Sequence, residues 1–270
     1  MSGLLRGVNA HPRRPALRGP ILIVLGLILF SAAACSGGLP EPGQGGADPD
    51  GPIATPTPAI DRNLLAPDLQ TLPPFKLSLQ STLEGGRELR FGTTIVNLGQ
   101  GPLDLLGQPD SAGRTVVTQR IARIDGGISA RQVGNFILHP THEHWHFEDF
   151  MEFELWSYAP GGRLEQRLVT SGKLTFCIFD TETIEPAAAK AAAFSECGNE
   201  AQGISVGWGD TYDAPVPGQA LDVSDIADGR YALRMIADPD DRLLELDETN
   251  NANVAYIEIA WPVVELREGP

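Results

Sequence analysis

The chain has 270 residues, 42% of them hydrophobic, and a formal net charge of −15. Such a length and composition suffice for one sizeable domain with a buried core. The first 35 residues hold four arginines and no acidic residue, so the remainder is more acidic still. A surface of this sign repels nucleic-acid phosphates and attracts cationic partners, amines included, although solubility explains the charge equally simply. The composition therefore excludes nucleic acid as a partner.

Residues 1–35 have the features of a signal peptide. Arginines precede the apolar run ILIVLGLILF, which is short for a membrane span, and the small residues SAAAC follow it. A cysteine directly after small residues resembles a bacterial lipobox. This predicts lipidation of Cys35 and an exported protein, anchored to the membrane at the cell surface or facing the periplasm. Ordinary cleavage nearby is the alternative, and RRPALR loosely resembles a twin-arginine signal.

Residues 36–72 are interpreted as a linker. Their first part, SGGLPEPGQGGADPDGPIATPTPAI, is crowded with glycine, proline and small polar residues and has no apolar period. Such a composition is typical of a disordered tether. The folded domain is therefore expected at residues 73–270.

The rest of the chain has the pattern of an all-β protein. Short segments rich in β-branched and aromatic residues alternate apolar with polar positions, and glycine and proline turns separate them. The predicted strands cover 87–99, 114–124, 148–158, 173–179, 229–238 and 250–261. Alanines favour one short helix at 185–194. The sequence thus predicts a β-sandwich with long functional loops and little helix.

Two cysteines remain once Cys35 is assigned to lipid. In an exported protein, Cys177 and Cys197 most simply form a disulfide, which would close a loop of about twenty residues and contribute about 3 kcal/mol in the chain-entropy model. A metal-binding role is the alternative, which the missing CxxC spacing disfavours.

Four of the five histidines lie in one stretch, LHPTHEHWHFEDF. If this stretch is extended, His142, His144 and His146 point to one face, with about 6.5 to 7 Å between successive side chains. Three imidazoles with an open position suit a catalytic copper or zinc ion. The spacing predicts a metal site and leaves open both the metal and whether His139 joins it.

Two scarce residues follow the histidines. Lysine occurs only three times against seventeen arginines. Two residues separate Lys173 from the stretch FCIFDT that follows it. Tyr212 is one of four tyrosines and ends the tripeptide DTY. Together with HEHWH, these residues resemble the lysyl oxidase family of copper amine oxidases. The resemblance extends from about Arg87 to Ile259.

The resemblance implies a site and a reaction. In that family an HxHxH triad binds copper, and a lysine and a tyrosine cross-link into lysine tyrosylquinone. It implies that His142, His144 and His146 bind copper and that Lys173 and Tyr212 form the quinone. The expected reaction is the oxidation of primary amines, free or on protein lysine side chains, to aldehydes with release of hydrogen peroxide and ammonia.

Some questions stay open at the level of sequence. The catalytic base is not singled out, since Asp180, Asp210 and Asp213 all lie near the quinone residues in sequence. A metal-binding or adhesive cell-surface β-sandwich without enzymatic activity is the main alternative function. A zinc-dependent hydrolase is a weaker one, because no HExxH-like helix is present.

Overall fold

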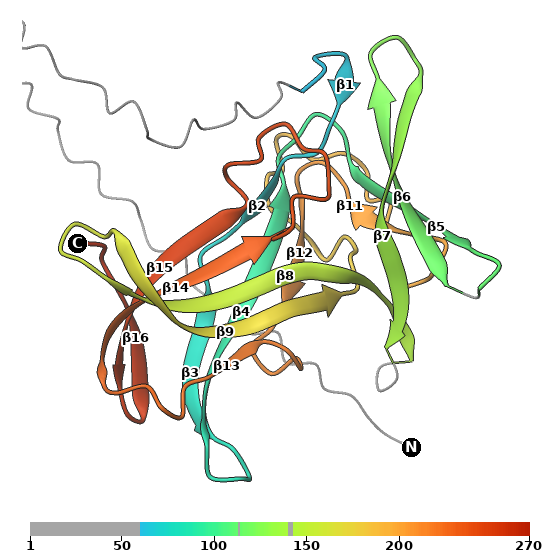
Figure 1. Cartoon of the computed structure of the whole chain (residues 1–270). Helices are drawn as coiled ribbons and strands as arrows, with labels where there is room; N and C mark the ends of the chain where they lie inside the picture. Colours follow the sequence, from blue (N-terminus) through green and yellow to red (C-terminus); the bar gives the residue numbers. More distant parts are fainter. Residues whose placement is uncertain (1–59, 113, 140–142) are drawn as a thin grey trace, which may run out of the picture. The chain divides into compact units, whose positions relative to one another are not determined.

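The computed structural model describes residues 60–112, 114–139 and 143–270 (Figure 1). The predicted signal peptide, Cys35 and the tether up to residue 59 lie outside the described residues, as does His142. The described residues form β-strands and no helix, which confirms the all-β prediction. No helix that could cross a membrane occurs in this part of the chain.

The larger of two antiparallel sheets contains ten strands. Its main path runs in the order β11, β5, β6, β7, β8, β14, β15 and β16, while β1 pairs with β6 and β9 pairs with β8. The bounds are β1 Leu64–Leu65, β5 Leu103–Pro109, β6 Thr115–Arg123, β7 Ile128–His139, β8 His144–Tyr158, β9 Leu164–Phe176, β11 Ala201–Ile204, β14 Gly229–Ala237, β15 Ala252–Ala260 and β16 Val263–Arg267.

The smaller sheet is built around one long strand, β4. Strands β2, β3, β12 and β13 all pair with β4, and β10 pairs with β12. The bounds are β2 Leu69–Thr71, β3 Phe75–Ser81, β4 Arg87–Asn97, β10 Glu182–Thr183, β12 Trp208–Tyr212 and β13 Ala220–Asp222. Because β1 and β2 pair within the sheets, residues 60–72 belong to the folded body and not to the linker that the sequence predicted.

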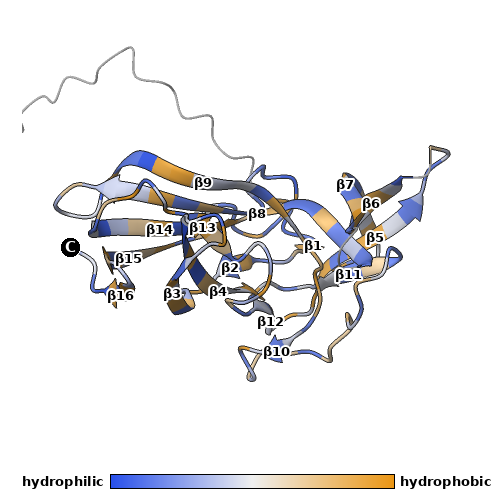
Figure 2. Ribbon diagram, turned by 90° about the horizontal axis from the view of Figure 1, so that it is seen from below, coloured by the Kyte–Doolittle hydropathy of each residue, from blue (hydrophilic) through white to orange (hydrophobic). Residues whose placement is uncertain are grey.

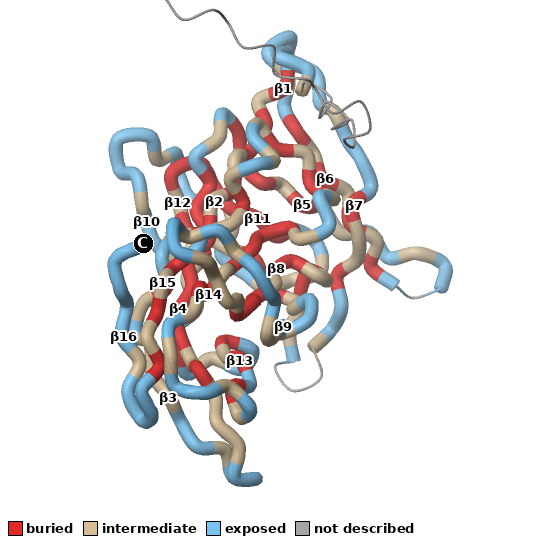
Figure 3. Tube along the Cα trace, turned by 60° about the vertical axis from the view of Figure 1, so that its left-hand side comes forward, coloured by how far each residue is buried: buried red, intermediate tan, exposed pale blue. Residues whose placement is uncertain are grey.

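The core lies where β4 packs against β8 and its neighbours. Phe91 of β4 meets Phe153 of β8 edge to face, with ring centroids 4.9 Å apart. Nearly all of β4 is buried, as are long parts of β8 and β14 (Figure 3). Hydrophobic and hydrophilic residues alternate along the outer strands (Figure 2), as expected for sheets with one solvated face.

Strand β9 differs from the strand that the sequence predicted. It begins at Leu164 and ends at Phe176, so Lys173 lies near its end and does not open a strand. The pairing of β8 with β9 shifts register four times, once between the Phe147 and Met151 pairs. Bulges of this kind change which way side chains face, and they occur here beside the histidines.

The predicted helix at 185–194 does not form. Only one turn is present, in which the amides of Ala188 and Ala189 donate to the carbonyl of Glu185. The Glu185 amide instead donates to Gly207, at 3.0 Å, and the Lys190 amide donates to Val206, also at 3.0 Å. A segment this short is marginal as a helix, so partners elsewhere in the chain outweigh the alanine propensity.

Gly207 makes this packing possible. It has a φ of +80°, and a Cβ at this position would lie 2.6 Å from the Cα of Ala189. Glycine is the residue that tolerates both the left-handed backbone and the close approach. The 185–194 segment is therefore held as an irregular loop against the start of β12.

Candidate active site

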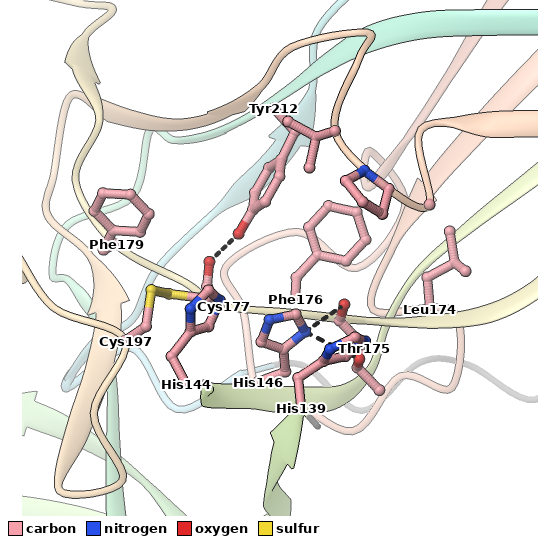
Figure 4. A pocket seen from close by; sticks show the side chains of 13 residues that line it. His139, His144, His146, Leu174, Thr175, Phe176, Cys177, Phe179, Cys197 and Tyr212 are labelled. Carbon is pink, nitrogen blue, oxygen red and sulfur yellow. Dashed lines mark hydrogen bonds between the residues drawn. A yellow bond between two sulfur atoms is a disulfide. The ribbon is translucent and has the colours of Figure 1, made fainter. Parts of the chain in front are cut away.

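The hairpin of β7 and β8 brings three described histidines together (Figure 4). His139 ends β7 and is the register partner of His144, which begins β8. The ring of His146 lies 4.7 Å from that of His139 and 4.9 Å from that of His144, centroid to centroid. The predicted convergence is thus present for His144 and His146, and His139 joins them. His142 lies outside the described residues, so its part in the site stays a prediction.

Thr175 orients the buried imidazole of His146. The Nδ1 atom of His146 lies 3.1 Å from the carbonyl oxygen of Thr175 and 3.1 Å from its Oγ1. Because a carbonyl can only accept, the contact with the Thr175 carbonyl is a hydrogen bond when Nδ1 carries the proton, which leaves the lone pair of the ring on Nε2. A hydrogen bond of this kind is typical of metal-binding histidines, whose other nitrogen holds the ion. Sequence reasoning missed Thr175, and its place two residues after Lys173 was the only available signal.

Tyr212 reaches the same pocket from the other sheet. It ends β12, and its ring meets that of Phe176 edge to face at 4.4 Å. Its hydroxyl donates a hydrogen bond to the carbonyl oxygen of Cys177. Burial, and secondly the carboxylate of Asp210, raise the pKa of Tyr212 well above its usual value of 10. The phenol is therefore neutral at physiological pH.

The predicted disulfide between Cys177 and Cys197 is present, with Cα atoms 5.3 Å apart. Both cysteines line the pocket. The Trp145 amide, between two of the histidines, donates to the Cys197 carbonyl at 2.9 Å. The disulfide therefore links the end of β9 to a loop that is itself bonded to the histidine strand. The Cys177–Cys197 disulfide thus fixes one part of the pocket wall covalently.

The pocket has a volume of about 440 Å³, and its walls are mainly apolar. Leu174, Phe176, Phe179 and Val216 form much of the wall, together with the histidines and Tyr212. No described carboxylate is among the residues that line it. The acidic charge of the chain therefore does not extend to the walls of this pocket, and charge alone does not select its ligand.

Lys173 does not lie with Tyr212. It is not among the described residues that line the pocket, and its ammonium forms an ion pair with Asp240. Its side chain is 39% exposed. Asp240 also accepts a hydrogen bond from Arg242 at 2.8 Å, and Arg242 donates to Asp149 at 2.6 Å. The structure thus brings Tyr212 to the histidines and places Lys173 outside, in a network of surface charges.

Together, the fold and the pocket define an all-β sandwich with a pocket lined by three described histidines and Tyr212. A family model described as lysyl oxidase matches residues 126–266, which is more than half of the chain. The chain belongs to the lysyl oxidase family. The match includes the histidines, Lys173 and Tyr212. The match begins after residues 87–99, so the resemblance noted for those residues lies outside the matched range.

Curated relatives support the same family. Lysyl oxidase homolog 1 of Homo sapiens is 32% identical over 122 residues, which cover 44% of this chain and 20% of the relative. Lysyl oxidase homolog 3A of Danio rerio is 35% identical over 121 residues, covering 44% and 15%. Lysyl oxidase homolog 2 of Xenopus tropicalis is 34% identical over 119 residues, covering 43% and 14%. The chain thus spans a fifth or less of the length of these relatives.

Proposed function

We propose that the protein is a copper-dependent amine oxidase. A primary amine, dioxygen and water would give an aldehyde, ammonia and hydrogen peroxide. The observation that carries this proposal is the meeting of the His139, His144 and His146 imidazoles and the Tyr212 hydroxyl around one apolar pocket. Membership of the lysyl oxidase family supports it.

The donor set of the pocket fits copper. Imidazole nitrogen is a preferred ligand of copper, and His146 is already oriented through Nδ1 by Thr175. We assign His142, His144 and His146 as the ligands, with His139 beside them. When bound, copper would supply the redox chemistry by which dioxygen oxidises the ring of Tyr212.

The apolar walls act on the substrate and on water. Phe176 and Phe179 would cover the stem of an amine and keep bulk water from the reacting groups. Because the described lining holds no carboxylate, the walls suit an uncharged stem, whether of a free amine or of a lysine side chain on a protein. The amine nitrogen would then be the polar end of the ligand, directed to the Tyr212 position.

Lys173 would complete the cofactor by adding its amine to the oxidised ring of Tyr212. For this step the side chain must leave Asp240, lose its proton and turn into the pocket. In this proposal the described conformation corresponds to the state before cross-linking. The register shifts near the end of β9 mark a segment whose pairing is irregular, where such a change disturbs few ladder bonds.

The mass of a peptide containing both Lys173 and Tyr212 tests this proposal directly. After copper loading in air, the wild type should bind about one copper per chain, show the cross-linked mass and release peroxide from a primary amine. Tyr212→Phe lacks the phenolic oxygen, so it should bind copper but show neither cross-link nor turnover. Tyr231→Phe is the matched control and should behave as the wild type.

The same experiment separates the rival function. A metal-binding or adhesive module would bind copper and show no cross-link in the wild type. Full peroxide release by Tyr212→Phe with copper bound would also remove the quinone mechanism. In the first case the protein would be better described as a non-enzymatic surface module, and in the second as an oxidase that does not use Tyr212.

We further propose that the protein is exported and anchored to a membrane through a lipid on Cys35. The Cys177–Cys197 disulfide supports this location, because disulfides persist in oxidising compartments. Mass spectrometry of the mature amino terminus should find a lipidated Cys35 in the membrane fraction. A soluble mature protein that begins elsewhere would reject the anchor and leave the enzymatic proposal intact.

A further inference from the structure

Three aspartates lie close to the quinone residues in sequence, and the structure separates their roles. Asp213 follows Tyr212 directly but is exposed. Both of its carboxylate oxygens accept hydrogen bonds from Lys76, each at 2.9 Å. The hydrogen bond from Lys76 is the first cause that lowers the pKa of Asp213. Asp213 is therefore a surface ion-pair partner.

Asp180 is half-buried and acts as a structural anchor. Its carboxylate accepts hydrogen bonds from the amide and the hydroxyl of Ser205, at 2.7 and 2.8 Å. It also accepts from the amides of Ala193 and Phe194, at 2.9 and 3.1 Å. Three of these donors share Oδ2 and one binds Oδ1. Asp180 is therefore committed to holding the loop before β11 in place.

Asp210 is the exception among the three. Its side chain is fully buried, and it shares a face of β12 with Tyr212 because the two positions are two residues apart. The Phe179 amide and the Tyr212 hydroxyl lower its pKa in part, but neither oxygen of Asp210 reaches hydrogen-bond geometry with a described donor. Burial first, and then the charge of Asp180, raise the pKa of Asp210 well above its ordinary value.

A buried carboxylate without such donors is costly for the fold. An asparagine or an apolar residue would fit the same space at a lower cost, so stability does not account for an aspartate there. What distinguishes the position is its neighbour. The Tyr212 hydroxyl lowers the pKa of Asp210, and the Asp210 carboxylate raises the pKa of Tyr212.

We infer that Asp210 accepts the hydroxyl proton of Tyr212 when that residue is converted into the cofactor. This inference rests on the proposed function. In the step, the O–H bond of Tyr212 breaks and an O–H bond forms on a carboxylate oxygen of Asp210. The negative charge moves from the carboxylate to the phenol oxygen, and no electron is transferred. Rotation about the C–O bond of Tyr212 redirects its proton from the Cys177 carbonyl to Asp210.

The geometry leaves few other acceptors. The Cys177 carbonyl holds the hydroxyl hydrogen but is far too weak a base to take the proton. Phe176 packs against the Tyr212 ring at 4.4 Å between centroids, and the described histidines of the same pocket are assigned to copper or lie beside it. A proton acceptor must lie within hydrogen-bond reach of the proton it takes, directly or through one water. Asp210 is the aspartate that shares a face of β12 with Tyr212, and in the inferred step rotation of the Tyr212 hydroxyl or one bridging water brings the two groups into hydrogen-bond contact.

The test is the rate of Lys173–Tyr212 cross-linking after copper is added to the copper-free full chain in air, followed by peptide mass. Asp210→Asn keeps the size of the side chain and removes its basicity. It should bind copper as the wild type does and cross-link about 100-fold more slowly or worse, the effect typical of a lost acid–base group. Asp213→Asn, the matched control, should stay within about twofold of the wild type, because Asp213 is on the surface.

A second measurement uses the wild type alone and does not depend on the folding of a variant. The titratable groups that act on Asp210 are Asp180 and Tyr212. The cross-linking rate of the wild type should rise with pH along an acidic limb as Asp210 ionises, and Asp213→Asn should keep that limb. A flat profile, or an Asp210→Asn protein that cross-links at the wild-type rate, would overturn the inference alone. A wild type that never cross-links would overturn the proposed function as well.

Discussion

Tyr212 and Lys173 both lie close to the end of β9, yet their surroundings are opposite. The ring of Tyr212 packs on Phe176, its hydroxyl donates to the Cys177 carbonyl, and it lines the pocket with the histidines. Lys173, three residues before Phe176, lies on the outside in an ion pair with Asp240. One half of the proposed cofactor is therefore in position before maturation, and the other half is held apart by charge. In the proposed cross-linking, the lysine must therefore move and the tyrosine need not.

Lys173→Arg should have the largest effect. Arginine can keep the ion pair with Asp240, but its guanidinium stays protonated and cannot act as an amine nucleophile. We expect normal folding and copper binding, with complete loss of the cross-link and of turnover. The variant should also fail to react with phenylhydrazine, a carbonyl reagent that would titrate the quinone. Lys76→Arg, at another lysine paired with an aspartate, is the control and should be fully active. Any cross-linked mass in Lys173→Arg would show that another residue is the nucleophile.

Thr175→Val tests the histidine side of the pocket, where Thr175 orients the His146 ring. The variant removes Oγ1 and leaves the carbonyl that also accepts from His146. Because hydrogen bonds behind metal ligands typically affect affinity 10- to 100-fold, we expect copper binding about tenfold weaker by competition with a chelator. Thr170→Val, which removes a hydroxyl of β9 bonded to Glu152, should leave the affinity unchanged. An equal loss in both variants would indicate a general effect on the strand.

Asp240→Asn tests the ion pair that holds Lys173 outside the pocket. We expect a smaller effect than in the two variants above, and an increase in the cross-linking rate. Exposed ion pairs contribute about 0.2 to 1 kcal/mol, so releasing Lys173 should speed cross-linking by about two- to fivefold. Added salt should raise the wild-type rate similarly and have little effect on the variant, because salt screens the pair. Asp104→Asn, which breaks the exposed Arg120 pair, is the control. A slower rate in Asp240→Asn would mean that Asp240 guides the lysine and does not restrain it.

Alkaline titration should give the smallest effect. The pKa of Tyr212 is raised in the folded state, so above pH 10 the unfolded chain loses a proton that the folded chain keeps. Stability should therefore fall as pH rises above 10, by at most about 1.4 kcal/mol per pH unit for this group. Urea unfolding of copper-free protein at pH 9 to 11 measures this slope. Tyr212→Phe should have a shallower slope, and identical slopes would place the phenol in contact with solvent.

Much of the fold and part of the site could be predicted from signals local in the sequence. The alternation of apolar and polar residues is a property of each strand by itself, so the all-β class and the long strands β4, β6, β8, β14 and β15 were predictable. The even pair Cys177 and Cys197 indicated the disulfide, and the spacing of His144 and His146 placed both on one face of β8. These features need only the geometry of an extended chain and the chemistry of the side chains.

Other features depended on contacts between segments distant in sequence. The 185–194 segment has helical propensity, but its amides find partners near Gly207, which no local pattern encodes. Lys173 is the register partner of Glu152 in β8 and forms an ion pair with Asp240, and both residues are distant from it in sequence.

The sequence by itself thus determined which residue types could bind a metal and form a quinone, and in which class of fold. The tertiary structure decided which of them meet, because position and burial are set by the packing of two sheets. Asp180, Asp210 and Asp213 are equivalent in the sequence. Packing leaves the first with four donors, the second buried without one in hydrogen-bond geometry among the described residues, and the third on the surface with Lys76. A carboxylate's chemistry depends on its solvation and its neighbours, and these exist only once the chain has folded.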